Sequence, residues 1–369
     1  MILRGKYNTA KVFTHNIDEE TKSQIINFCD QDFAKDSKIR IMPDTHAGVG
    51  CVIGFTANLG DKVIPNIVGV DIGCGLLVIE LKKTSIDLKK LDNLINKYIP
   101  SGRGIQKSIL YNFENLEKLH CYRELKNIDR IKRSIGTLGG GNHFIEINKD
   151  DEGNFYLVIH SGSRNLGNQV AQYYQRKAIE LHKGKEKSYP RTLCYLEGKW
   201  REKYLNDMKI CQEYATLNRQ VMASIILDKM FGTSLEDYNN FETIHNYINF
   251  KDNIIRKGSI SAYKGEKIII PINMRDGSLL CIGKGNENWN YSAPHGAGRL
   301  MSRKKAKESI TMEDYKNSMK DIYTTSVNLS TLDEAPMAYK PMEEIINNIG
   351  ETAEVLKIIK PVYNFKAGE

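Results

Sequence analysis

The segment 66–79 is an apolar run interrupted by a carboxylate and a thiol three residues apart, Asp71 and Cys74. Gly73 and Gly75 flank the thiol, and glycine lets a backbone turn sharply or approach a ligand closely. A buried Asp is costly unless it is paired, hydrogen-bonded or bound to a cation, and a metal holds a bound thiol as thiolate. The pair therefore indicates one corner of a metal site. The alternative is a free core cysteine beside an Asp that caps a turn.

A glycine-rich loop, 136–141, directly precedes a run with the alternation of a strand. Free backbone amides in such a loop can cradle a phosphate. Asn142, His143 and Glu146 then supply an amide, an imidazole and a carboxylate within five residues, a set suited to phosphate contact, metal ligation or base recognition. The loop has the spacing of neither a Walker A motif nor a dinucleotide fingerprint. A flexible turn with a surface histidine is the alternative.

A strand-like run ends in His160, and a Ser-Gly-Ser turn then leads into a helix that begins near Arg164. A helix N-terminus attracts anions, and a guanidinium group matches the geometry of a phosphate. His245 is a further isolated imidazole. The chain has only eight histidines, and four of them, including His143 and His295, lie in polar contexts rich in Gly or Asn. Taken singly, each is also explained as a structural residue.

Small residues surround His295 where a loop leads into a helix, and four cations follow within ten residues: Arg299, Arg303, Lys304 and Lys305. A nucleophilic or phosphate-binding imidazole suits this setting, because amides and cations stabilise charge that develops on a phosphoryl group during transfer. A basic helix with a capping turn is the alternative.

Short β-branched runs bounded by Gly, Pro or Asn predict the strands that position these residues. They are 38–42, 52–56, 76–81, 156–160, 267–272 and 279–282. Helical spacing predicts a helix through Tyr214 and Ile225 that ends at Gly232. A second helical pattern runs from Met342 as far as Leu356.

Strands and helices are interspersed without the strict alternation that a doubly wound sheet requires. No internal repeat and no long Pro/Ser/Gly linker divides the chain. We therefore expect an α+β fold, in which residues 1–369 form a single large mixed domain with a helical insertion at about 166–250.

The composition, 41% hydrophobic and 27% charged residues in 369, is that of a globular chain. Lys and Arg exceed Asp and Glu by eight, which suits a polyanionic partner without requiring one. Seven cysteines without a C-x-x-C pair favour a reducing compartment, the cytoplasm, over a disulfide framework or a zinc knuckle. Without a signal-peptide pattern or an apolar run of about 18 residues, neither secretion nor a membrane partner is expected.

Seven short motifs occur along the chain. They are M-P-D-x-H at 42–46, V-D-I-G-C-G at 70–75, G-N-H-F-I-E at 141–146, H-S-G-S-R at 160–164, H-G-A-G-R at 295–299, M-S-R at 301–303 and D-E-A-P-x-A-Y-K at 333–340. Together they resemble the RtcB family of GTP- and manganese-dependent RNA-splicing ligases. The resemblance extends from near Met42 to the C-terminus, and it implies an RtcB-like fold around a central cleft for metal and nucleotide.

The resemblance implies a centre of two Mn²⁺ ions bridged by Cys74, with Asp71 and His143 on one ion and His160 and His245 on the other. This agrees with the donors identified from the residues themselves. Such donors tolerate Mn²⁺ without selecting it, because nitrogen and sulfur sites usually prefer later metals such as zinc. The identity of the metal therefore comes from the family alone.

The resemblance also implies that His295 attacks the α-phosphate of GTP and forms a covalent histidine–GMP adduct. The guanylyl group would pass to an RNA 3′-phosphate, and a 5′-hydroxyl would then join that end and expel GMP. A 2′,3′-cyclic phosphate would first be hydrolysed. RNA with these ends would be the partner, in tRNA splicing or RNA repair. The sequence leaves open whether an archease-type activator also takes part.

The family's guanosine contacts correspond to these positions: Asn142, Phe144, Glu146, Asn246, Asn273, Met274, Ser278, Gly296, Ala297, Gly298, Tyr339 and Lys366. By the same resemblance, Tyr339 stacks on guanine, while Glu146 and Lys366 read its edge. Contacts to RNA phosphates are expected from three arginines: Arg164, Arg299 and Arg303. Such contacts would make RNA binding depend on salt.

The chain departs from the family pattern beside the expected nucleotide. Pro271-Ile-Asn-Met stands where the family usually has Pro-Gly-Ser-Met, and Pro294 replaces a small polar residue. Two other functions therefore stay open. One is a metal-dependent cyclic phosphodiesterase without sealing activity, and the other is a basic RNA-end-binding protein with a relic pocket.

Overall fold

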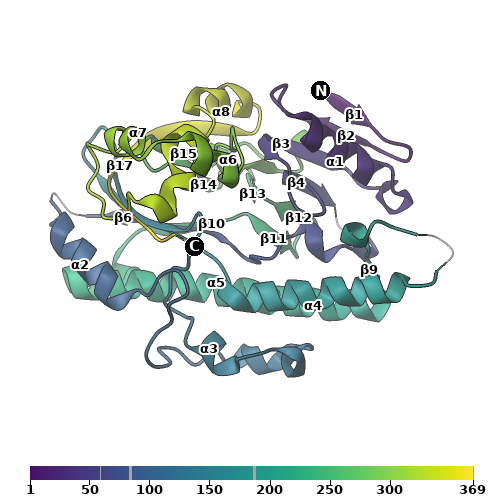
Figure 1. Cartoon of the computed structure of the whole chain (residues 1–369), viewed down its shortest axis with the longest axis horizontal. Coiled ribbons are helices and arrows are strands. Elements are labelled where there is room, and N and C mark those ends of the chain that lie inside the picture. Colours follow the sequence, from purple (N-terminus) through teal and green to yellow (C-terminus); the bar gives the residue numbers. More distant parts are fainter. Residues whose placement is uncertain (59, 83–84, 186–187, 369) are drawn as a thin grey trace.

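The computed structural model describes residues 1–58, 60–82, 85–185 and 188–368, and it has the predicted α+β fold. Figure 1 shows two long helices that lie side by side beneath the sheets, α4 (Arg164–His182) and α5 (Gly198–Phe231). These helices contact each other, and α5 also contacts strands of both large sheets. The position of α5 lets one helix support residues from either sheet.

The first large sheet is mixed. Its strands are, in spatial order, β1 (Ile2–Arg4), β2 (Thr9–Val12), β3 (Ile39–His46), β4 (Ile53–Asn58), β12 (Ile254–Lys257) and β11 (Asn246–Asn249). Strands β2 and β3 pair in parallel, and the other neighbouring pairs are antiparallel.

The second large sheet is antiparallel throughout the described residues. Its strands are, in spatial order, β10 (Asn240–Ile244), β6 (Gly75–Leu81), β8 (Phe155–Ser161), β7 (Phe144–Lys149), β17 (Ala353–Lys366), β15 (Gly277–Gly283) and β14 (Lys267–Asn273). Since β10 ends at Ile244 and β11 begins at Asn246, the single residue His245 links the two sheets at this point.

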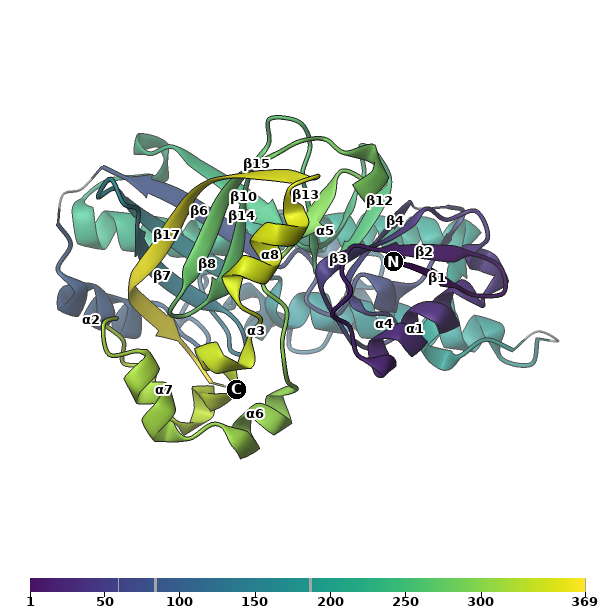
Figure 2. The ribbon, with the colours of Figure 1, turned by 90° about the horizontal axis from the view of Figure 1, so that it is seen from above.

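Shorter elements complete the fold. The helices are α1 (Glu19–Cys29), α2 (Leu88–Tyr98), α3 (Ile128–Lys132), α6 (Arg303–Ser309), α7 (Met312–Ser318) and α8 (Met342–Ile349). Two strand pairs form small sheets, β5 (Lys62–Val63) with β9 (Leu196–Glu197) and β13 (Ser259–Ser261) with β16 (Ser292–Pro294). In Figure 2 the N-terminal strands and α1 lie at one side of the molecule, away from α6, α7 and the C-terminus.

The main hydrophobic core lies between the sheets and the long helices. Phe55 of the first sheet belongs to one buried cluster with Tyr174 of α4 and Tyr214 of α5. Leu157 of the second sheet belongs to another, with side chains of α2 and α5 such as Ile226. Among the described residues, no helix combines the length and apolarity needed to cross a bilayer.

The predicted strands are confirmed as β3, β4, β6, β8, β14 and β15, whose ends differ from the predictions by a few residues. The prediction that a helix ends at Gly232 is also confirmed, because this residue caps α5 with a φ of 65°, which favours glycine. The helical region is shorter than the expected insertion at 166–250. It ends at Phe231, and residues 240–244 and 246–249 are strands.

The second predicted helix is partly wrong. It ends at Ile349, and the apolar residues Ala353 and Leu356 that continue its spacing belong to β17. Burial alternates along the start of β17, where Ala353 is buried and Leu356 is 52% exposed. The helical spacing therefore arises where two elements with different periods follow each other. Strand β17 continues to Lys366, which pairs with Phe144 of β7.

Candidate metal and nucleotide site

Three neighbouring strands of the second sheet present polar side chains at the same end. Cys74 lies directly before β6 and His143 directly before β7, while His160 lies near the end of β8, which pairs with both strands. His245 donates its backbone amide to the carbonyl of Cys74 at 2.9 Å. Strand pairing therefore brings together residues that lie far apart in the sequence.

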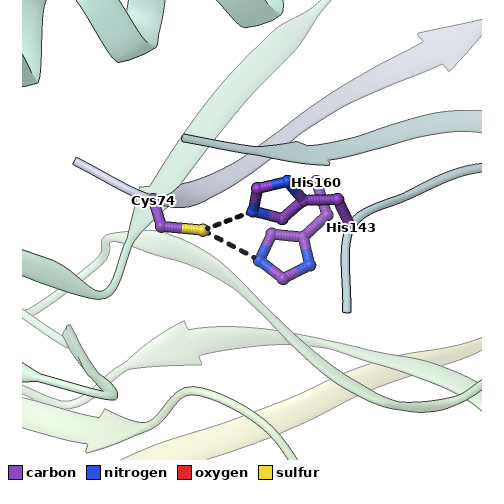
Figure 3. A group of neighbouring side chains, drawn as sticks. All are labelled: Cys74, His143 and His160. Carbon is purple, nitrogen blue, oxygen red and sulfur yellow. Dashed lines mark hydrogen bonds between the residues drawn. The ribbon is translucent and has the colours of Figure 1, made fainter. Parts of the chain in front are cut away.

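These four buried side chains form one cluster together with Asp71, whose side chain is 30% exposed. In Figure 3 the sulfur of Cys74 faces the rings of His143 and His160, at 3.4 Å and 3.3 Å from their Nε2 atoms. The Nε2 atoms of His160 and His245 lie 3.4 Å apart. Oδ2 of Asp71 lies 2.9 Å from Nε2 of His143. The structure thus brings together all five residues that the sequence predicts as metal ligands.

Backbone carbonyls bias the tautomers of two rings. Nδ1 of His160 lies 3.1 Å from the carbonyl oxygen of Asn142, and Nδ1 of His143 lies 2.9 Å from that of Leu138. When Nδ1–H donates to a carbonyl, Nε2 carries a lone pair, which is the form that binds a metal. In His143, Arg164 Nη1 lies 3.0 Å from Nδ1 and Oδ2 of Asp71 lies 2.9 Å from Nε2, and both contacts favour the opposite tautomer. A cation at Nε2 would select the first form.

Burial and neighbouring polar groups together set the charge states in this cluster. Burial lowers the pKa of His160 and His245 well below the usual value, so both rings are neutral. Burial also raises the pKa of the Cys74 thiol, and the Asp71 carboxylate raises it further. Although burial opposes the ionisation of Asp71, its hydrogen bond and charge interaction with His143 lower its pKa to about 2. The cluster thus offers a carboxylate, the neutral imidazoles of His160 and His245, and a thiol.

This donor set fits a cation. Oδ1 of Asp71 is buried and has no hydrogen-bond partner among the described residues, an arrangement that a bound cation would stabilise. Sulfur and nitrogen ligands of one tetrahedral ion lie roughly 3.4–3.6 Å apart. The sulfur–nitrogen separations among Cys74, His143 and His160, 3.3–3.4 Å, are close to that value.

His295 follows β16 and lies beside the cluster, with its ring centroid 4.8 Å from that of His245. Its Nδ1 lies 2.6 Å from Oδ2 of Asp44, a fully buried residue of β3. The same oxygen accepts hydrogen bonds from the backbone amides of His295 and Gly296 at 3.1 Å and 3.2 Å. With Nδ1–H donating to Asp44, Nε2 of His295 carries the lone pair that a nucleophile needs.

A cavity of about 270 Å³ connects the cluster and His295 with a second polar region around Tyr339. Every predicted guanosine contact lines it: Asn142, Phe144, Glu146, Asn246, Asn273, Met274, Ser278, Gly296, Ala297, Gly298, Tyr339 and Lys366. Arg299 and Arg303 also line this cavity, whereas Arg164 contacts His143. The Cys/His/Asp cluster, the ring of His295 held by Asp44 and this cavity therefore adjoin one another.

The family model described as tRNA-splicing ligase RtcB matches residues 24–128 and 116–367. The chain belongs to the RtcB family. A curated relative, the RNA-splicing ligase RtcB of Escherichia coli strain K12, is 31% identical over 94% of each chain. The tRNA-splicing ligase RtcB of Methanococcus maripaludis is 27% identical over 98% of this chain and 94% of its own. That of Nanoarchaeum equitans is 26% identical over 83% of each.

In this member of the RtcB family, a buried carboxylate organises the end of the cavity near Tyr339. Oε2 of Glu334 lies 2.6 Å from Nζ of Lys366 and accepts a hydrogen bond from the Tyr339 hydroxyl at 2.6 Å. Arg299 and Arg303 also pair with Glu334. Burial opposes ionisation of Glu334, but Lys366 and Arg303 outweigh it and lower its pKa to about 2. Sequence reasoning missed Glu334, although it lies in the D-E-A-P motif.

Glu146, the other carboxylate at this end, is held by amides. Its Oε1 accepts a hydrogen bond from Asn364 at 2.7 Å, and its Oε2 accepts one from Asn148 at 3.1 Å. Burial raises its pKa to about 7, although these amides and Lys366 oppose the shift. Nearby, the side chain of Asn273 caps its own turn by accepting the amides of Arg275 and Asp276.

Two buried residues of α5 support the cluster from behind, and sequence reasoning missed both. Nη1 of Arg219 donates to the carbonyls of Gly73 at 2.8 Å and Ser161 at 2.7 Å, the neighbours of Cys74 and His160. Its Nε donates to Glu242 at 2.9 Å.

The preceding residue, Asn218, accepts the amides of Gly136 and Thr137 and donates to carbonyls of residues 137 and 162. One helical turn thus fixes three loops around the cluster. An Arg in an amphipathic helix normally indicates a solvated face, so the sequence pattern gives no sign of this role.

Lys257 is a third missed residue, at the end of β12. Its buried ammonium group donates to the carbonyls of Val49, Cys51 and Asn66 at 2.6–3.0 Å. Burial lowers its pKa. Because Asn66 belongs to the run that leads to Asp71, this lysine connects the β3–β4 loop with the segment that carries a predicted metal ligand.

Proposed function

We propose that this protein is an RNA ligase that joins a 3′-phosphate or 2′,3′-cyclic phosphate end to a 5′-hydroxyl end, using GTP and Mn²⁺, in tRNA splicing or RNA repair. Membership in the RtcB family supports ligation of RNA. The observation that carries the chemistry is the position of His295, whose ring is held by Asp44 and lies beside a buried Cys/His/Asp cluster.

The first step uses His295 as the nucleophile. Its Nε2 attacks the α-phosphorus of GTP, the bond to the β-phosphate oxygen breaks, and pyrophosphate leaves. Asp44 keeps the proton on Nδ1 and stabilises the positive charge that develops on the ring. When held by Asp71, Cys74, His143, His160 and His245, two Mn²⁺ ions supply positive charge that offsets the charge of the phosphates.

The guanine base binds at the other end of the cavity. The Tyr339 ring stacks on the base, and its hydroxyl is fixed by Glu334. Ionised Glu146 accepts hydrogen bonds from the donor edge of guanine, while Lys366 offers a donor. The remaining cavity residues position the ribose and phosphates: Asn142, Phe144, Asn246, Asn273, Met274, Ser278, Gly296, Ala297 and Gly298.

The later steps return His295 to its starting state. An oxygen of the RNA 3′-phosphate attacks the phosphorus of the adduct, and the bond to Nε2 breaks. The 5′-hydroxyl then attacks the activated 3′-phosphate, its proton is lost, and GMP leaves as the new phosphodiester forms. Arg164, Arg299 and Arg303 hold the phosphates of the RNA.

Covalent labelling tests the proposal. The protein is incubated with Mn²⁺ and GTP that carries ³²P on the α-phosphate, and label on the denatured chain is measured. We expect label on the wild type and on His15→Ala, a variant of an exposed histidine, and none on His295→Ala. An RNA with a 3′-phosphate and a 5′-hydroxyl should be joined by the same proteins.

Two results would contradict the proposal. Absence of label on the wild type, with RNA cyclic phosphate still opened by His295→Ala, would identify a phosphodiesterase without sealing. RNA binding that is indifferent to Cys74→Ala, without label or ring opening, would identify an RNA-end-binding protein.

A further inference from the structure

An irregular segment connects α2 with the short helical turn 114–118 and lies against the glycine-rich loop. We call residues 99–113 the α2 loop. Leu138 donates its amide to the carbonyl of Pro100 at 2.9 Å, and Gly102 donates to that of Gly139 at 2.8 Å. Gln106 Nε2 donates to the carbonyl of Gly136 at 2.7 Å. The glycine-rich loop, which leads to Asn142 and His143, therefore anchors the α2 loop.

Arg164 connects the α2 loop with the metal cluster. A Cβ atom on Gly139, whose φ is +85°, would lie within about 2 Å of the Arg164 guanidinium, so the guanidinium packs against that glycine. Its Nη1 also contacts Nδ1 of His143. A chain of contacts thus leads from His143 through Arg164 and Gly139 to Gly102. The α2 loop thus packs beside the residues that carry the cluster, outside the lining of the cavity itself.

The α2 loop carries positive charge that acidic residues do not neutralise. Arg103 and Lys107 are exposed, and neither forms an ion pair with any residue in the described part of the chain. Arg130 of α3 donates to the backbone carbonyl of Arg103 and likewise has no acidic partner there. Residues 97–133 contain nine Lys or Arg and four Asp or Glu, so much of the chain's excess of eight positive charges lies here.

The same loop exposes three consecutive large apolar residues. Ile109 and Leu110 are each 45% exposed, and Tyr111 is 51% exposed. The Tyr111 ring packs against no other aromatic ring of the described residues. Unpaired cations next to an accessible aromatic ring are the combination that binds single-stranded nucleic acid, through phosphate contacts and base stacking. A long ordered loop without helix or strand is typical of a binding loop.

We propose that the α2 loop binds the single-stranded RNA next to the reacting ends, with Arg103 and Lys107 on its phosphates and Tyr111 stacked on a base. This inference rests on the proposed ligase function, which supplies RNA at the cluster. If the loop instead binds a protein, the partner would bring acidic side chains to Arg103 and Lys107. The affinity for RNA would then not depend on these two cations.

The first experiment measures RNA affinity against salt. Binding of a fluorescent single-stranded RNA with a 3′-phosphate is followed by anisotropy for the wild type and for Arg103→Ser/Lys107→Ser. Arg4→Ser/Lys35→Ser is the matched control, because it removes the same charge from exposed positions in the N-terminal region. We expect the slope of log affinity against log salt to fall by about 0.7 for each phosphate that the variant no longer binds, and only in the loop variant.

The second experiment tests stacking. Tyr111→Ala should weaken RNA binding by about tenfold, whereas Tyr111→Phe, which keeps the ring, should bind like the wild type. Thermal unfolding of each variant verifies that the loop substitutions leave the fold intact.

Covalent labelling by GTP without RNA separates this inference from the proposed function. All loop variants should be labelled like the wild type. If the wild type is not labelled but its RNA binding still depends on the α2 loop, the proposed ligase function is wrong and the inference about the loop stands. If the loop variants and the control bind RNA with the same affinity and slope, the inference is wrong. If the loop variants bind an archease-type activator more weakly than the wild type does, while their affinity for RNA is unchanged, the α2 loop binds a protein partner and not RNA.

Discussion

The two ends of the cavity differ in how their polar groups are satisfied. At the end formed by Asp71, Cys74 and the neighbouring histidines, which we call the metal end, Oδ1 of Asp71 has no hydrogen-bond partner among the described residues. Burial keeps His160 and His245 neutral there. At the end near Tyr339, which we call the guanine end after its proposed ligand, Glu334 already binds Lys366, Tyr339 and Arg299. At the metal end, no side chain of the described residues binds Oδ1 of Asp71, and a metal cation would fill that role. The contrast therefore lies between the two carboxylates, Asp71 and Glu334, because Oγ of Ser278 and Oδ1 of Asn364 near Tyr339 also lack a hydrogen-bond partner among the described residues.

This difference predicts which substitutions have the larger effects. Removing a metal donor leaves a site that no other side chain completes, so the loss is close to total. Removing one polar group at the guanine end leaves its neighbours in place. The loss of ligand affinity should therefore be partial, and it should depend on pH where the group titrates.

Cys74→Ala should have the largest effect. The sulfur lies between His143 and His160 and is the only thiol among the described residues of the cluster. We expect the affinity for Mn²⁺, measured by titration calorimetry, to fall by more than about 100-fold, since even residues around metal ligands contribute about 10- to 100-fold. Labelling by GTP should fall to background. Cys194→Ala, which removes a buried thiol elsewhere, is the control. An unchanged affinity for Mn²⁺ would exclude Cys74 as a ligand.

Asp44→Asn should slow labelling while leaving the metal in place. The substitution removes the negative charge that holds the proton on Nδ1 of His295. Positioning and proton transfer of this kind contribute about 10²- to 10⁴-fold in rate. We expect a loss in that range in the rate of adduct formation, with an unchanged affinity for Mn²⁺. Equal losses in both quantities would mean that Asp44 supports the whole site and does not act specifically on His295.

Arg219→Met should weaken the metal end from a distance. The guanidinium holds the carbonyls of Gly73 and Ser161, so its loss lets the segments that carry Cys74 and His160 separate. We expect a loss of about 10- to 100-fold in Mn²⁺ affinity. Glu242, whose side chain is 20% exposed and keeps a hydrogen bond from Thr216, loses its charged partner, so the free energy of unfolding should also fall, by about 1–3 kcal/mol.

Arg219→Lys keeps the charge and should restore part of both quantities. The visible absorption of bound Co²⁺ reports ligand geometry and should shift in Arg219→Met. An unchanged spectrum and affinity in a less stable protein would reduce Arg219 to a structural role.

The sequence could predict site residues that interrupt a local pattern, but not residues whose role depends on long-range contacts. Asp71, Cys74 and His295 were identifiable because polar groups interrupt apolar or glycine-rich runs, and the family motifs located their partners. Asp44 was not identified, because its role appears only when His295, 251 residues away, lies beside it. Long-range contacts of this kind leave no local pattern. Arg219 shows a second limit, since helical periodicity cannot distinguish a buried arginine that binds carbonyls from an exposed one.

Glu146→Gln should have the smallest effect and should show it only as a dependence on pH. Burial raises the pKa of Glu146 to about 7 from an ordinary value of 4.5. The folded protein therefore binds this proton more tightly than the unfolded chain, and the stability that the protonated group provides is lost as pH rises from 4.5 through 7. This contribution falls by about 2 kcal/mol between pH 5.5 and 8.

Glutamine does not titrate, so the stability of Glu146→Gln relative to the wild type should rise by that amount over the same pH interval in urea unfolding. GTP binding should show the opposite trend, because only the ionised carboxylate accepts the hydrogen bonds of guanine. The wild type should therefore bind GTP more tightly than the variant at pH 8, and the two should converge near pH 5.5. A difference in stability that stays constant from pH 5.5 to 8 would show that Glu146 does not titrate in this range. The effect of a substitution at the guanine end would then not depend on pH, and this part of the contrast between the two ends would be wrong.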